Sequence, residues 1–192
     1  MKPFKLILRI VMALFITNLP AQSLVKCNNN MAYWIIPDND LLYAIALKGD
    51  VDLSENPDII NINETALQYI LLDKSNYLDK KNDDEPLLLR YIATEQEHLR
   101  NIFATRSLLI TSEIILLPAL GKKAVFWSFD LPEGKNSEVV SQLFLNIVSE
   151  GNILGLGTPL FTDSDFSEAK KLLIDALETL HTIPNTESLC QE

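Results

Sequence analysis

The sequence predicts an α+β fold, an antiparallel meander sheet flanked by helices. Three observations predict it. Lys123–Pro132 (KAVFWSFDLP) has the composition of a buried strand. Further apolar runs are separated by short turns, as in a meander. The segments 86–103 and 162–181 show the 3.6-residue periodicity of amphipathic helices.

The strand at 123–131 is the centre of this prediction. Successive side chains of a strand point to opposite faces. One face would carry Val125, Trp127, Phe129 and Leu131, and the other Ala124, Phe126, Ser128 and Asp130. We expect the two helices to cover both faces and to leave no room for a reaction centre. Pro132 ends the strand because it has no N–H to donate.

The first half of the chain predicts short strands. They are 41–47, 59–62 and 66–72, with a loop at 51–58 and a tight turn at Asn63-Glu64-Thr65. The polar stretch 74–85 predicts a second loop.

The first helix is expected over Pro86–Phe103, because proline is well tolerated in the first turn. Its predicted apolar stripe consists of Leu88, Tyr91, Ile92, Leu99, Ile102 and Phe103, and we expect Glu95, Glu97 and Arg100 to face outward.

The second half predicts two hairpins and a closing helix. The hairpins pair 108–117 with 123–131 and 142–148 with 153–156. For the closing helix we expect Thr162 as N-cap, Asp165 completing a capping box, and Phe161 and Phe166 forming a hydrophobic staple. His181 would lie near its negative end, before Ile183-Pro184 stops it.

Residues 1–23 resemble an export signal. Lys2, Lys5 and Arg9 precede a short apolar run, and Ala21-Gln22-Ser23 offers small residues at the positions that a signal peptidase reads. The run is too short for a membrane span. Lys26 before Cys27 does not fit a lipoprotein signal. We therefore expect a periplasmic or secreted protein without a membrane span after the signal is removed.

The expected organisation is a signal at 1–23, an N-terminal extension at 24–40, a single α+β domain at 41–184 and a tail at 185–192. The 169 residues after the signal are enough for one domain with a substantial core. They hold 13 basic and 26 acidic residues, a net charge of −13. So acidic a chain argues against nucleic acid and anionic membranes as partners.

Cys27 and Cys190 are the two cysteines, one near each end of the exported chain. Export would permit a disulfide between them. The alternative is two free thiols in mobile terminal segments, and the sequence leaves both open.

The order of elements resembles the PsbP-like α/β/α sandwich family. The resemblance depends on 124–132 (AVFWSFDLP), on Gln142-Leu143-Phe144-Leu145 and on the helix 172–180. That family includes the extrinsic PsbP subunit of photosystem II and a Ran-binding nuclear-import protein. The chain is more similar to small exported bacterial members without an assigned activity. The resemblance implies a binding or assembly module outside the cytoplasm.

We find no pattern that indicates a catalytic, cofactor-binding or metal site. Glu95 and His98 form a single Glu-x-x-His spacing, whereas di-iron bundles need two such motifs and two more glutamates. We interpret the pair as a solvated helix surface. Gly151, Gly155 and Gly157 do not have the spacing of a dinucleotide or phosphate loop, so turns and close backbone contacts explain them better.

Two functions remain. The first and favoured one is an exported, non-enzymatic module that binds an unknown protein or small ligand. The alternative is an exported hydrolase with an unrecognised carboxylate site. Its clustered candidates are Asp130 beside Ser128, and the acids at 163–168.

Overall fold

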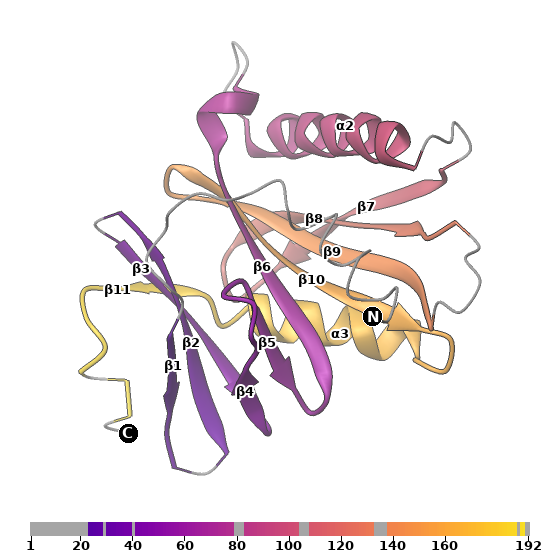
Figure 1. The fold of residues 1–192 in the computed structure, drawn as a ribbon. Coiled ribbons are helices and arrows are strands. Elements are labelled where there is room, and N and C mark those ends of the chain that lie inside the picture. The colour runs from indigo at the N-terminus through magenta and orange to yellow at the C-terminus, as the bar shows by residue number, and fades with distance from the viewer. Residues whose placement is uncertain are drawn as a thin grey trace.

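The computed structural model describes residues 23–28, 30–39, 41–78, 83–103, 108–132, 138–187 and 189–190. These residues form three layers (Figure 1). Helix α2 (Asp84–Ile102) forms one outer layer, a large antiparallel sheet the middle one, and helix α3 (Phe166–Leu177) with a smaller sheet the third. The predicted α+β class, a meander sheet flanked by helices, is confirmed.

The large sheet has seven strands within the described residues, ordered β4-β5-β6-β10-β9-β8-β7. Their bounds are β4 (Val51–Leu53), β5 (Ile59–Ile62), β6 (Thr65–Asp73), β7 (Ile110–Leu117), β8 (Lys122–Asp130), β9 (Val139–Ser149) and β10 (Asn152–Phe161). Both predicted hairpins, β7–β8 and β9–β10, are present. The sequence predicts a loop where the structure has the short edge strand β4. Only the first residue of β4 is buried, so its sequence has no pattern that would indicate a strand.

The smaller sheet contains β1 (Ser23–Lys26), β2 (Met31–Asp38), β3 (Leu41–Lys48) and β11 (His181–Ile183), in the order β1-β2-β3-β11 among the described residues. Residues 24–40 were expected to precede the domain. Instead β1 and β2 belong to it, which corrects the expected start at residue 41. Residues 1–22 of the predicted signal lie outside the described residues.

Strand β2 escaped prediction because its pattern is irregular. Buried residues run consecutively over Trp34–Pro37 instead of alternating with exposed ones. Pro37 also argues against a central strand. The structure accommodates it because β1 pairs only as far as Ile35, so no neighbour on that side needs the missing N–H of Pro37.

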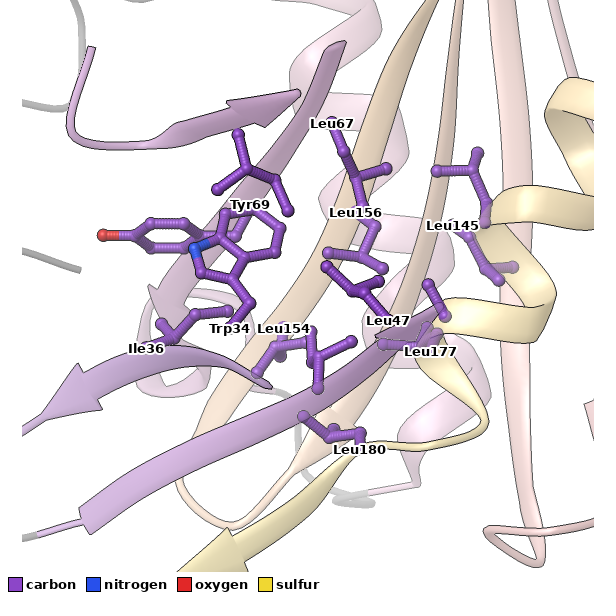
Figure 2. Packing of buried hydrophobic residues seen from close by; sticks show 14 of the residues in the cluster. Trp34, Ile36, Leu47, Leu67, Tyr69, Leu145, Leu154, Leu156, Leu177 and Leu180 are labelled. Atoms are coloured by element: carbon purple, nitrogen blue, oxygen red, sulfur yellow. The ribbon is translucent and has the colours of Figure 1, made fainter. Parts of the chain in front are cut away.

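The main core lies between the large sheet, the smaller sheet and α3 (Figure 2). Trp34 of β2 is fully buried, and its ring meets that of Tyr69 edge to face at 5.5 Å. Leu177 of α3 and Leu180 after it close the same core. The predicted apolar stripe of α3 therefore packs on the sheet.

Helix α3 begins later than expected, and the predicted capping box is wrong. Asp165 is the N-cap, and its carboxylate accepts hydrogen bonds from the N–H groups of Ser167 and Glu168 at 2.6 and 3.2 Å. Thr162 instead bonds to the carbonyl of Glu138. With Asp165 as N-cap, Phe161 and Phe166 do not lie at the two positions of a hydrophobic staple, and the ring of Phe166 packs edge to face on Phe126 at 5.8 Å.

His181 lies beyond the helix and not near the end of its last turn. It begins β11, where its Nδ1 lies 2.9 Å from the carbonyl of Thr179. Its ring meets Tyr33 edge to face at 6.2 Å. The helix ends at Leu177, which leaves room for β11 to pair with β3.

Helix α2 covers the opposite face of the large sheet. It packs on Val125, Trp127 and Phe129 of β8, while Phe126 faces α3. The predicted sandwiching of this strand is confirmed. A 3₁₀ turn, η1 (Lys74–Tyr77), precedes α2 inside the expected loop. Neither described helix has the length and hydropathy needed to cross a membrane.

A disulfide joins Cys27, just after β1, to Cys190 in the C-terminal segment, with their Cα atoms 5.4 Å apart. Leu189 beside it is 8% exposed and packs on Ile35 and Ala44. Leu189 and Cys190 of the tail at 185–192 therefore lie against the smaller sheet. The bond encloses nearly the whole domain, with a separation of 163 residues.

We expect the double variant Cys27→Ser/Cys190→Ser to fold and to be less stable than the oxidised protein. Closing so long a loop restricts the unfolded chain, which gives at most about 5 kcal/mol on the chain-entropy account. Urea unfolding of both proteins, with and without reductant, measures the difference. Reductant should lower the stability of the wild type only. An equal stability of both oxidised samples, or a free-thiol count of two in the wild type, would contradict the pairing.

Candidate functional site

A pocket of about 40 Å³ lies between α2 and the large sheet. Its walls are mostly aromatic and aliphatic, with three polar side chains, and comprise Gln68, Ile70, Tyr91, Glu95, His98, Leu99, Ile102, Trp127, Phe129 and Phe144. Helix α2 therefore leaves a small space between itself and the sheet beside β8. Its lining, mostly apolar with a few polar groups, is that of small-ligand sites, while its volume is well below the roughly 300–1,000 Å³ of sites for drug-sized molecules, so only a small ligand suits it.

Two glycines of β10 shape the sheet beneath the pocket. A Cβ at Gly157 would lie 2.7 Å from the ring of Phe144, and one at Gly155 would lie 2.0 Å from Nδ2 of Asn146. Both glycines therefore let a side chain of β9 lie close against the sheet. This confirms that close backbone contacts explain these two residues.

Three stacked aromatic rings form the floor. Trp127 and Phe144 stack with ring centroids 4.3 Å apart, and Phe129 stacks beside them at 6.2 and 6.1 Å. The indole N–H of Trp127 donates to Oδ1 of the fully buried Asn146 at 2.8 Å. This bond fixes the indole, and Nδ2 of Asn146 has no partner among the described residues.

Helix α2 contributes Glu95 and His98 from the middle of its buried stripe. We had expected Glu95 to face outward and the Glu-x-x-His pair to be a solvated surface. Both side chains instead line the pocket and are half-buried. Glu95 follows Tyr91 and precedes Leu99 by four residues each, so it shares their side of the helix.

The electrostatics of the pocket are dominated by this one carboxyl. Burial raises the pKa of Glu95, with no described cation nearby to oppose the shift. Burial also raises the pKa of Tyr91 and of Tyr77, and the charge of Glu95 adds to both shifts. The charge of Glu95 thus acts on both tyrosines, the partly buried Tyr77 and the buried Tyr91, whose rings meet edge to face at 5.4 Å.

The three polar side chains of the pocket have no mutual or external hydrogen bonds within the described residues. Gln68, Glu95 and His98 form no side-chain hydrogen bond or ion pair there. A carboxyl, an imidazole and an amide are therefore available to a ligand. No group of three His, Cys, Asp or Glu residues that could hold a metal ion occurs in the part of the chain that the structure describes.

The carboxylate candidates from the sequence are engaged elsewhere. The hydroxyls of Ser128 and Thr111 lie 2.8 Å apart in a hydrogen bond, and Asp130 accepts from Ser141 at 2.6 Å. Asp165 caps α3, and the acids at 163–168 are exposed. None of these residues lines the pocket.

We expect Glu95→Gln to be more stable than the wild type, by a margin that grows with pH. In the folded protein the raised pKa keeps the proton on Glu95 to a higher pH than in the unfolded chain. The wild type therefore loses stability as the pH rises from about the ordinary value of 4.5 through the raised folded pKa, whereas glutamine does not titrate. Urea unfolding across this range measures the difference.

Glu97→Gln is the matched control, because it removes the same charge from an exposed position of the same helix. A pH-independent difference for Glu95→Gln, or one that favours the wild type at high pH, would contradict the burial of an unpaired carboxyl.

Comparison with known proteins gives similarity of fold alone. No family model and no curated protein matches the sequence. Among solved structures, the chain is similar to the solution structure of cyanobacterial PsbP from Synechocystis sp. PCC 6803. The match has a TM-score of 0.45 and 9% sequence identity, and it covers 88% of this chain and 96% of that one.

Proposed function

We propose that the protein is an exported, non-enzymatic binding module that takes a small ligand in the pocket beneath α2. The observation that carries this proposal is the pocket itself. Aromatic rings form its floor, and three polar side chains at its walls have no partner within the described residues. An arrangement of this kind provides apolar contact area together with a few orienting hydrogen bonds.

Two features support export. The first 23 residues have the pattern of a signal sequence. The Cys27–Cys190 disulfide is of a kind that persists in oxidising compartments and is rare in the cytosol. Both features support our proposal that the protein works in the periplasm or outside the cell.

The hydrolase alternative is retained because of one observation. Glu95 combines a raised pKa with a position in a pocket, which is typical of general acids. A hydrolase also needs a second carboxylate or a nucleophile with a base. His98 and Tyr91 are the other titratable groups among the described lining residues, which include no Ser, Thr, Cys or second carboxylate. This favours binding over hydrolysis.

A fragment screen by two-dimensional NMR tests the proposal. The probes are phenol, indole, phenethylamine and cyclohexanecarboxylate, added to the oxidised protein. At least one should shift the Trp127 indole N–H and the Gln68 side-chain amide, because both residues line the pocket. The substitution Ile102→Trp should abolish these shifts by filling the pocket.

Leu53→Trp is the matched control, because it adds the same ring at a half-exposed position of the edge strand β4. Shifts that gather elsewhere, or that persist in Ile102→Trp, would refute the pocket as the ligand site. Turnover of ester, peptide or glycoside substrates that Glu95→Gln removes would favour the hydrolase.

A further inference from the structure

The partial burial of the Glu95 carboxyl costs free energy of folding, and no contact within the described residues explains why a carboxyl stands at this position. A charged group that leaves water is normally paired or hydrogen-bonded. Glu95 lies in the buried stripe of α2 and lines the pocket, yet it has neither kind of partner within the described residues. An apolar residue there would pack on the sheet without this cost, so the carboxyl points to a ligand.

The charges around the pocket favour a cation over an anion. No lysine or arginine is among the lining residues that the structure describes. The whole chain carries a net charge of −10, so its long-range field also attracts cations. Among the described lining residues, no basic side chain would offset the repulsion between Glu95 and a ligand carboxylate or phosphate.

The remaining walls favour an organic cation over a metal ion. A metal ion would need several oxygen or nitrogen ligands, whereas aromatic and aliphatic side chains form most of this surface. Aromatic rings attract ammonium groups and bury apolar bodies equally well. The ring row of Trp127, Phe129 and Phe144, with Tyr91 opposite at 6.4 Å from Trp127, supplies this surface.

We propose that the pocket binds a small organic cation, an amine or quaternary ammonium group on a short apolar or aromatic body. The cationic group would lie against Glu95, and the apolar body against the ring row. Gln68 and His98 would hydrogen-bond any further polar group. This inference rests on the proposed function, since it names the class of ligand for the same pocket.

Calorimetric titration with two matched probes tests the ligand class. Phenethylamine carries the cation, and 2-phenylethanol is its neutral counterpart. At about pH 8 an alkylamine is still protonated. We expect the amine to bind at least about tenfold more tightly to the oxidised protein, as a charge-assisted bond predicts. Glu95→Gln should remove most of this preference, and Glu97→Gln should retain it.

The outcomes separate the two proposals. Equal affinity for both probes, or a preference that survives in Glu95→Gln, overturns the cation inference and leaves the pocket as a site for neutral ligands. Tight binding of zinc chloride without amine binding also overturns it. If no probe, charged or neutral, affects the Trp127 indole signal, the pocket is no ligand site and both proposals fail. If a variant folds poorly, the affinities of the wild-type protein for phenethylamine and 2-phenylethanol still decide whether the pocket prefers a cation.

Discussion

The structure depends on one constraint, which is that the central strands of the large sheet are buried on both faces. Ala124–Phe129 of β8 are all buried, with Phe126 turned toward α3 and Trp127 toward α2. Each face therefore needs its own cover. Helix α3 and the smaller sheet cover one face, and α2 covers the other (Figure 1). The Cys27–Cys190 disulfide then ties the two ends of the chain together on the smaller sheet.

The two faces of the large sheet are not packed equally well, and the pocket arises from this difference. On the α3 side, leucine and isoleucine side chains from both sheets and from α3 fill the core (Figure 2). On the α2 side, two glycines of β10 let Phe144 and Asn146 lie close to the sheet. Helix α2 then places the polar side chains of Glu95 and His98 over this part of the sheet, at positions where aliphatic side chains would fill the space. A gap that retains polar groups without partners is unusual for a core and typical of a binding site.

Much of this architecture could be predicted from local sequence patterns. The alternation in 123–131 correctly separates Trp127 from Phe126, because strand geometry gives each residue a definite face. Strand β2 could not be identified in this way, since a consecutive run of buried residues has no period and Pro37 argues against a strand. The N-cap of α3 was placed three residues early because Thr162 and Asp165 both suit that position, and only the chain path decides between them.

The pocket was missed for a related reason. Glutamate on an amphipathic helix usually faces water, and this expectation outweighed the position of Glu95 within the stripe of Tyr91 and Leu99. The i, i+4 spacing was a usable signal, since it places the carboxyl on the buried side. The contributions of Gln68 and Phe144 could not be foreseen. They depend on the register of β6 and β9 with β10, which involves pairing between distant parts of the chain.

Hydrogen exchange of the Trp127 indole N–H tests the two-sided burial most directly. A Trp34→Phe variant assigns its NMR signal, because the chain has two tryptophans. The account predicts exchange as slow as global unfolding, since the indole is 2% exposed and donates to Asn146 inside the sheet. Exchange at the rate of a free indole would show that α2 does not cover this face, and the pocket and its proposed ligand would then have no basis.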